Sequence, residues 1–273
     1  MGTSYRLDRA FSQAPVLPLS TRSKYLLVSD CPRGVGTSSD NFLKNQHLYF
    51  AALEYYYRNG FSYIELGDGE ELWENRNLRN ITEIHNDVYE MLSCFDERDR
   101  LHLIYGNHDM IQKKNPAYHE ALILRSESVP GISLYLTHGH QASLLNSTFW
   151  RVARFLVRYF WSPLENLGIL DPTSAAKNYD VKEKCEESLR HWAEENKHIL
   201  ITGHTHRPVM PEEPAYYYNT GSCVHPRCIT CIEIERGKLT LVKWSMQSRI
   251  DSVLYVEREV IGGPVDVLRN RNV

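Results

Sequence analysis

The sequence contains no apolar segment that approaches the roughly 18 uninterrupted residues of a membrane-spanning helix. Residues 1–20 carry Arg6, Asp8 and Arg9, and no secretory apolar region follows them, so we expect no signal peptide. We therefore expect a cytoplasmic protein without a transmembrane segment. Peripheral contact with a membrane surface stays open as an alternative.

The chain also lacks an excess of basic charge. Its 31 lysines and arginines stand against 34 aspartates and glutamates, which gives a formal net charge of −3. A protein that binds a nucleic acid polyanion usually carries a strong positive footprint. The composition thus gives no strong nucleic-acid signal, although a local basic groove would be compatible with it.

Two close pairs of cysteines, as in a typical zinc module, are missing as well. Six cysteines are scattered through 273 residues, and we interpret them as reduced thiols, since disulfide frameworks belong mainly to small secreted domains. The densest cluster has four potential zinc ligands, Cys223, His225, Cys228 and Cys231. It lacks the doubled Cys pairs typical of zinc modules, and residues 228–235 alternate like a strand. We therefore favour a strand here, with structural zinc as the alternative.

What the chain does have is enough apolar material for a large core. With 42% hydrophobic and 24% charged residues, we predict one domain over residues 1–273, although the length would also allow two. Apolar spacing predicts helices over 40–59, with Asp40 as N-cap, and over 80–95. A strand is predicted over 101–105. Short β runs follow His206, at 215–220, 228–235, 238–244 and 252–260.

Five polar clusters stand where strand-like runs end. They are Asp30, Gly67-Asp68-Gly69, Gly106-Asn107-His108-Asp109, Thr137-His138-Gly139-His140 and Gly203-His204-Thr205-His206. In an α/β sheet, the loops beyond the carboxyl ends of the strands converge on one crevice. A single Asp or His would more commonly cap a turn or pack, but five clusters in this order predict a metal site.

The ligand types indicate the chemistry. Imidazole, carboxylate and amide donors without thiolate suit manganese, iron, zinc or cobalt. Two such ions about 3.5–4 Å apart can lower the pKa of a shared water and clamp both oxygens of a phosphoryl displacement. Phosphoester hydrolysis is therefore the leading class of reaction.

These motifs resemble those of the calcineurin-like metallophosphoesterases. The family order is Asp-x-His, Gly-Asp-x-x-Asp, Gly-Asn-His-Asp or Glu, a His in a His-Gly-His-like loop, and Gly-His-x-His. The resemblance implies an α/β fold (α+β in some schemes) with two stacked mixed β-sheets flanked by helices. This is a four-layer αββα sandwich, here with a helical cap insertion at about 141–197.

The resemblance also implies a dinuclear metal centre. The first ion would be held by Asp30, Asp68 and His206. The second would be held by Asp68, Asn107, His138 and His204, with Asp68 as the bridge. A hydroxide bridging the two ions would be the nucleophile.

The first motif departs from the family pattern. The family has a histidine two residues after the aspartate, and this chain has Pro32 after Asp30. A proline side chain coordinates nothing and its nitrogen carries no hydrogen. We therefore expect the first site to be weak or empty unless water or substrate fills the gap.

The catalytic pair implied by the resemblance is His108 and Asp109. His108 would assist the leaving group, and Asp109 would orient its ring. A purely structural His108 is the alternative. Glu71, three residues after Asp68, is expected to support the site without binding a metal, whereas Glu70 and Glu74 are expected on a solvated face.

Substrate choice is expected to depend on the segment between His140 and His198. Arg151, Arg154 and Arg158 fall on one helical face among aromatic residues, which suits a phosphate-bearing lipid or nucleotide-linked glycolipid. The alternative is that these aromatics only pack on the core. A second cap helix is expected at about 174–196. Such an insertion is similar, more weakly, to that of the UDP-2,3-diacylglucosamine pyrophosphohydrolase branch. Arg33 either grips phosphate or pairs with nearby acids.

Three functions follow from these patterns. The first is a metal-dependent hydrolase of a phosphodiester or pyrophosphate bond in a small or lipid-linked substrate. The second is a phosphomonoesterase, or a nucleic-acid or cyclic-nucleotide phosphodiesterase, with the same site. The third is a non-catalytic scaffold weakened by Pro32. The sequence does not specify the oligomeric state.

Overall fold

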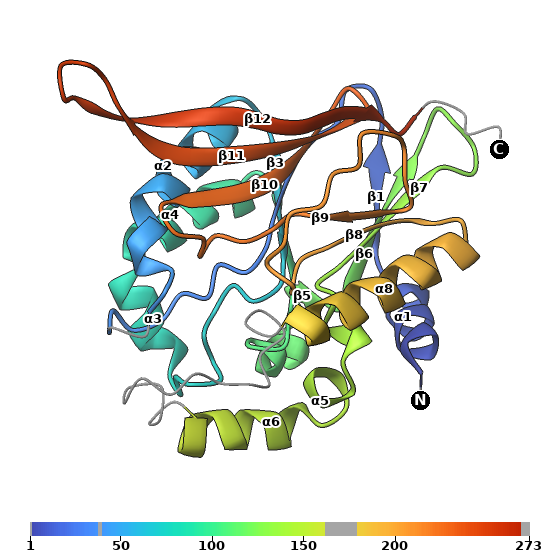
Figure 1. The fold of residues 1–273 in the computed structure, drawn as a ribbon, viewed down its shortest axis with the longest axis horizontal. Coiled ribbons are helices and arrows are strands. Elements are labelled where there is room, and N and C mark those ends of the chain that lie inside the picture. Colours follow the sequence, from blue (N-terminus) through green and yellow to red (C-terminus); the bar gives the residue numbers. More distant parts are fainter. Residues whose placement is uncertain (1, 38–39, 162–178, 269–273) are drawn as a thin grey trace.

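The computed structural model describes residues 2–37, 40–161 and 179–268 (Figure 1). Two mixed β-sheets stack face to face. The seven-stranded sheet has the order β12-β11-β10-β2-β3-β4-β5, and the five-stranded sheet has the order β1-β6-β7-β8-β9. The strands are β1 (Val16–Leu19), β2 (Lys24–Val28), β3 (Ser62–Leu66), β4 (Leu101–Ile104), β5 (Tyr118–His119), β6 (Ala121–Ser126), β7 (Ser133–Thr137), β8 (Ile199–Thr202), β9 (Tyr217–Asn219), β10 (Cys228–Glu235), β11 (Lys238–Ser248) and β12 (Leu254–Asp266).

Helices cover the outer face of each sheet (Figure 1). The helices are α1 (Thr3–Ser12), α2 (Gln46–Arg58), α3 (Leu78–Ile84), α4 (Asn86–Asp96), α5 (Leu144–Ser147), α6 (Trp150–Leu156) and α8 (Tyr179–Glu195). Short 3₁₀ turns are η1 (Leu43–Asn45), η2 (Met110–Lys114) and η3 (His140–Ala142), and the π-helical turn η4 (Val157–Trp161) continues α6. None of the helices in the described ranges is long and apolar enough to cross a membrane.

Three apolar clusters hold the layers together. The central cluster lies between the sheets, where Leu27 and Ile64 of one sheet meet Leu122 and Ile201 of the other. A second cluster packs α2 and α4 on the seven-stranded sheet, and a third packs α1 and α8 on the five-stranded sheet. Buried apolar area is the main source of stability in such layers. The four-layer αββα arrangement expected from the family resemblance is confirmed.

Several predicted elements are found with shifted boundaries. The predicted helix 40–59 becomes η1 and α2, and 80–95 becomes α3 and α4, which are separate helices on either side of His85. Spacing alone gave no sign of that break, because the apolar positions continue across it. Arg236 and Gly237 both adopt positive φ, at 54° and 72°, in the tight turn between β10 and β11.

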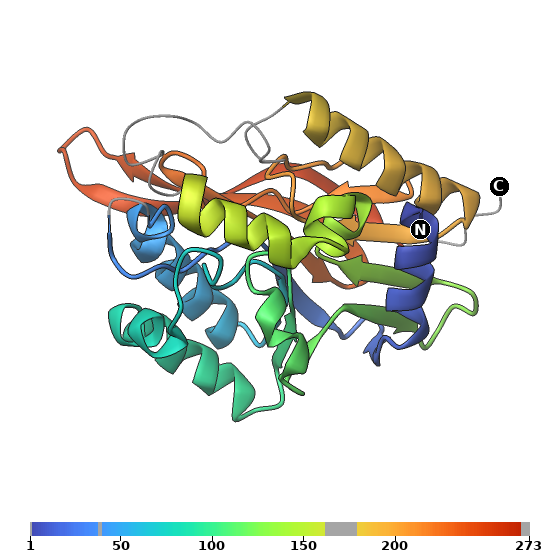
Figure 2. The same cartoon turned by 90° about the horizontal axis from the view of Figure 1, so that it is seen from below.

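The expected cap insertion divides into two different parts. Helix α8 packs Leu189, Trp192 and Ala193 into the third cluster, so most of it is a layer of the sandwich and not a cap. No residue of α6 is buried, and α5 and α6 lie in front of both sheets when seen from below (Figure 2). The prediction of a helix from 174 is tested only from 179, because 174–178 lie outside the described residues.

Candidate metal centre

The carboxyl ends of five strands deliver the predicted ligands to one edge of the molecule. Strands β2, β3 and β4 are parallel neighbours in one sheet, and β7 and β8 are parallel neighbours in the other. Each is followed within three residues by a polar cluster of the sequence. Six side chains are thereby assembled: Asp30, Asp68, Asn107, His138, His204 and His206. The first five are buried.

The backbone at this edge is held in an unusual conformation. Positive φ values occur at Asp30 (52°), Asp68 (55°), His204 (68°) and His206 (56°). Non-glycine residues adopt this region at a cost, and such strain concentrates at functional sites. The loops also pack closely here, because a Cβ on Gly106 would lie 2.1 Å from Oδ1 of Asp68. A residue with a side chain would therefore not fit at position 106.

Asp68, His138 and His204 form a ready group of metal ligands, with one ligand atom of each within 4.8 Å of the others. Nε2 of His138 lies 3.1 Å from Oδ2 of Asp68 and 3.2 Å from Oδ1 of Asn107. Its Nδ1 lies 2.7 Å from the carbonyl oxygen of Leu66, so Nδ1 donates there, and Nε2, which faces Asp68 and Asn107, is the nitrogen that would bind an ion. These contacts match the expected second site.

The titration behaviour of the group fits the same function. Burial opposes a charge on His138, but Asp68 outweighs burial and raises the pKa of His138 to about 9. Burial and the charge of His138 lower the pKa of His204 to about 3. His204 Nε2 is buried and has no hydrogen-bond partner, which is costly unless something binds it. The donor set therefore fits a divalent ion, whose charge would replace the proton on His138.

The expected first site is partly built. Nε2 of His206 lies 3.0 Å from Oδ1 of Asp30. Oδ2 of Asp30 accepts hydrogen bonds from the backbone N–H of His204 at 2.9 Å and from the Ser29 hydroxyl at 2.5 Å. Burial would raise the pKa of Asp30, but His206 outweighs it and the pKa is lowered. Pro32 contributes no donor at this end.

His108 lies at the partly exposed edge of the metal centre and contacts the carboxylate of Glu71. Its Nδ1 lies 2.7 Å from Oε2 of Glu71, and its ring stacks on Trp73 with centroids 4.6 Å apart. Burial opposes protonation, yet Glu71 and then Asp68 raise the pKa of His108 to about 10. A protonated imidazole of this kind can donate a proton to a leaving group.

The structure corrects the role that was expected of Asp109. Its carboxylate accepts the backbone N–H groups of Gly69 at 2.9 Å and Gly106 at 2.5 Å, so it ties two loops together. The ring of His108 is oriented by Glu71 through its Nδ1. Glu71 was expected to support the site, but not by this hydrogen bond. The spacing of Gly-Asn-His-Asp did not reveal it, because the two side chains of adjacent residues leave the backbone in different directions.

Arg33 forms ion pairs with the carboxylates of Glu65 and Glu70. It is fully buried, and its two terminal nitrogens each lie 3.0 Å from Glu65 oxygens, with Glu70 at 3.3 Å. The interpretation as a partner of nearby acids therefore holds, and the phosphate-gripping one does not. Glu70 is buried in this cluster, which corrects its expected place on a solvated face.

The three arginines of the cap occupy different environments. Arg158 donates to the carbonyl oxygens of Trp73 (2.7 Å), Leu72 (2.9 Å) and Asn75 (3.0 Å). It thus anchors the loop that carries Glu71. Arg151 is exposed and lies over the ring of Trp150.

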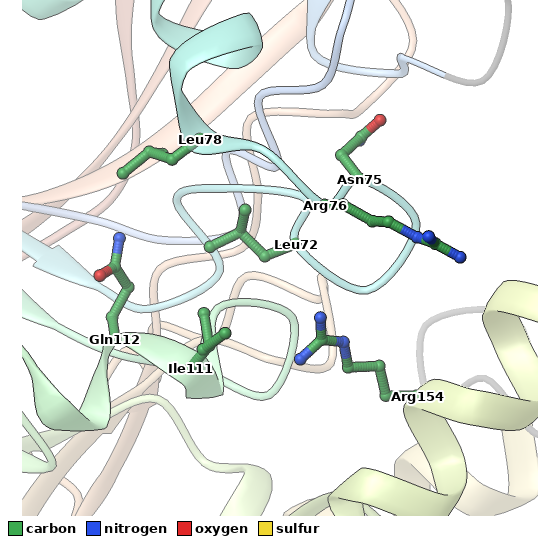
Figure 3. A pocket seen from close by; sticks show the side chains of 7 residues that line it. All are labelled: Leu72, Asn75, Arg76, Leu78, Ile111, Gln112 and Arg154. Carbon is green, nitrogen blue, oxygen red and sulfur yellow. The ribbon is translucent and has the colours of Figure 1, made fainter.

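Arg154 faces an open hollow of about 200 Å³ that is lined also by Leu72, Arg76 and Ile111. Figure 3 shows Arg154 reaching from α6 toward Ile111, with Arg76 on the opposite loop. Burial and the charge of Arg76 lower the pKa of Arg154. Within the described ranges, no carboxylate forms an ion pair with either arginine, so the hollow presents two unneutralised positive charges.

The cysteine and histidine cluster at 223–231 does not assemble as a zinc site in the described part of the chain. Cys223 and Cys231 are buried in the second apolar cluster. The Nε2 atom of His225 is buried without a hydrogen-bond partner.

Comparisons with known proteins found a matching family and a similar solved structure. A family model for the calcineurin-like phosphoesterase superfamily domain matches residues 82–235, which include Asn107, His138, His204 and His206. No curated protein matches the chain. Among solved structures, Vps29 of Chaetomium thermophilum is similar, with 14% identity, a TM-score of 0.44, and coverage of 89% of this chain and 97% of that one. The family match spans more than half of the chain, and the chain belongs to the calcineurin-like phosphoesterase superfamily.

Proposed function

We propose that this protein is a metal-dependent hydrolase of a phosphodiester or pyrophosphate bond in a small or lipid-linked substrate. Membership of the calcineurin-like phosphoesterase superfamily supports phosphoester hydrolysis in general. The observation that carries the proposal is the buried group of Asp68, His138 and His204, beside a protonated His108. Two divalent ions, when bound, would activate water and neutralise phosphate charge.

The residues of this chain supply the remaining functions. Asp68 would bridge the two ions, and its carboxylate also accepts the backbone N–H of His108 at 2.8 Å. That hydrogen bond fixes His108 relative to the metal centre. Glu71 keeps the imidazole charged, so His108 is able to protonate an alkoxide or phosphate leaving group.

A substrate with an apolar part is supported by the surface of α6. Phe149, Val152, Phe155 and Tyr159 are each about half exposed (49%, 53%, 54% and 50%). The alternative in which these aromatics only pack on the core is not supported by this exposure. Arg154 and Arg76 lie next to them, and an arginine beside an apolar surface suits a phosphate that carries a lipid.

The test compares substrates on the metal-loaded protein. We would measure hydrolysis of bis-nitrophenyl phosphate, nitrophenyl phosphate and a lipid-linked nucleoside diphosphate with added manganese. The matched control is the Asp68→Asn variant, which keeps the shape of the side chain and removes the bridging charge. Turnover of the diester or diphosphate, lost in Asp68→Asn, is the expected result.

Other outcomes would overturn the proposal in distinct ways. Faster turnover of the monoester would identify a phosphomonoesterase built on the same site. Absence of bound metal together with absence of turnover would favour a non-catalytic scaffold.

A further inference from the structure

We infer that His225 supplies the metal ligand that Pro32 cannot, so that the first metal site is completed from the loop between β9 and β10. This inference rests on the proposed function, because it concerns the same dinuclear centre. It differs from the family pattern, in which the missing histidine comes from the β2 loop.

The loop that carries His225 is fastened directly to the first site. The backbone N–H of Cys223 donates to the carbonyl oxygen of Asp30 at 3.1 Å, and the hydroxyl of Ser29 lies 3.2 Å from the carbonyl oxygen of Gly221. Residues 221–223 therefore run alongside Ser29 and Asp30. His225 follows two residues later.

A second anchor fixes the position of His225 itself. The side-chain amide of Asn45 donates to the carbonyl oxygens of Cys223 (2.8 Å), His225 (2.7 Å) and Cys228 (3.1 Å). The single side-chain amide of Asn45 thus holds three carbonyl oxygens of residues 223–228 together. The backbone of His225 is held without any use of its imidazole.

The imidazole has a free nitrogen in a place where one is costly. Nε2 of His225 is buried and has no hydrogen-bond partner. Buried polar atoms in native structures are almost always paired, so an unpaired one requires an explanation. A metal ion at the first site would provide it.

The electrostatic surroundings connect His225 with the first site. Burial and the charge of His206 lower the pKa of His225, whereas Asp30 raises it and Lys182 lowers it. The charged groups that act on this ring are therefore two of the three expected ligands of the first site, Asp30 and His206, and one lysine of α8.

The nearby cysteines do not compete for this role. Cys223 and Cys231 are buried in the second apolar cluster, and burial raises the pKa of Cys231 above its ordinary value. Both thiols therefore face apolar side chains of that cluster. Among the four candidate ligands of residues 223–231, His225 is the one whose ring is acted on by the charges of both Asp30 and His206.

The test is a metal titration. The native chain, stripped of metal, and the His225→Ala variant would be titrated with manganese by calorimetry, with metal content checked by elemental analysis. We expect two ions in the native chain, and an affinity for one of them that is about 10- to 100-fold weaker in the variant, which is the scale of changes around metal ligands.

Rescue separates coordination from a merely structural role. Adding Pro32→His to His225→Ala places an imidazole at the family position, and we expect it to restore the lost affinity. A packing defect would not be repaired from residue 32. His225→Gln, which keeps most of the side-chain volume, is the second variant. His191→Ala, on the exposed face of α8 with 68% side-chain exposure, is the control expected to bind like the native chain.

The outcomes distinguish this inference from the proposed function. Unchanged affinities in His225→Ala and His225→Gln, or a loss that Pro32→His does not restore, would overturn the inference alone. A native chain that binds no metal would overturn both.

Discussion

His108 depends on two neighbours for its protonation and its direction. Glu71 bonds Nδ1, and Trp73 packs against the face of the ring. The free edge of the imidazole therefore points away from Glu71, and the raised pKa, about 10, keeps the proton in place at neutral pH. His108 therefore carries a proton that it can donate as a general acid.

Replacing His108 with Gln is expected to lower kcat by about 10²- to 10⁴-fold, the usual contribution of general acid catalysis. Metal content should stay as in the native chain, since His108 is not among the proposed ligands. Elemental analysis beside initial rates on bis-nitrophenyl phosphate measures both. Equal kcat values for the two proteins would remove His108 from the mechanism.

A matched pair tests the corrected role of Asp109. Glu71→Gln should reduce kcat, because it removes the charge that keeps His108 protonated, and should leave the melting temperature nearly unchanged. Asp109→Ala should instead destabilise the fold by about 1–3 kcal/mol, since two buried N–H groups lose their acceptor. Thermal melts and rates on both variants would separate the two functions, and the opposite pattern would reinstate Asp109 as the orienting residue.

At the scale of elements, the turn that follows α6 acts on the active site through the 72–75 loop. Arg158 donates hydrogen bonds to three carbonyl oxygens of this loop, those of Leu72, Trp73 and Asn75, and Glu71 lies at its start. We expect Arg158→Ala to lower kcat more than it lowers metal binding. Arg151→Ala is the control on the same segment, because Arg151 is exposed and holds no part of the loop. Equal rates in the two variants would show that the hydrogen bonds from Arg158 to the 72–75 loop do not affect catalysis.

The segment before α2 depends on one buried carboxylate. Asp40 accepts the backbone N–H groups of Gly34 (3.1 Å), Gly36 (3.0 Å) and Leu43 (3.2 Å), and its Oδ2 lies 3.0 Å from Nε2 of His85. Burial would raise the pKa of Asp40, but the contact with His85 and the Gly36 N–H outweigh burial and lower it. The carboxylate therefore stabilises the fold in its charged form.

Asp40→Asn is expected to reduce the free energy of unfolding by about 1–3 kcal/mol at pH 7, since buried donors lose a charged acceptor. The native carboxyl has a lower pKa folded than unfolded, so this stabilisation is present above the ordinary value of 3.8 and is lost as the pH falls through the lower folded value. Urea unfolding at pH 7 and near pH 3 measures it. A stability difference that is the same at both values would contradict the assignment.

At the scale of the whole molecule, the proposed metal centre would join the two sheets. The proposed ligands come from β2, β3 and β4 on one side and from β7 and β8 on the other. An ion bound only by the folded protein stabilises it by about 2.7 kcal/mol when its concentration is 100 times Kd.

We therefore expect saturating manganese to raise the melting temperature by about 5 °C or more, taking about 2–4 °C for each kcal/mol in a large domain. A chelator should reverse the increase. The His204→Ala variant should respond much less, because it lacks a ligand with no other partner. A native melting temperature that does not change with manganese would argue against the metal centre.

The order of strands and polar clusters was visible in the sequence because it is local. Each candidate ligand stands within four residues of the end of a strand, and parallel strands bring such positions to one edge for purely topological reasons. The clusters that contain Asp30, Asp68, Asn107, His138, His204 and His206 were predicted on that basis, and their assignment as metal ligands followed from the family resemblance. The family match and the two stacked sheets confirm the family and the fold, whereas the ligand set stays a prediction.

What the sequence could not provide are contacts between segments that are distant in the chain. The burial of Arg33 between Glu65 and Glu70, the pairing of Glu71 with His108, and the packing of α8 as a layer each depend on where two elements meet. His225 is the clearest case. In the sequence, His225 stands among cysteines and suggests a zinc site. Only the packing of residues 221–223 against Asp30 places His225, with its unpaired nitrogen, beside the proposed first metal site.

The sequence by itself determined the class of chemistry, because donor types and strand-end positions are properties of short segments. The tertiary structure decided which charges face the site and which are neutralised in the core. Charge–charge interaction depends on distance and burial, and neither quantity is encoded in any short stretch of this chain.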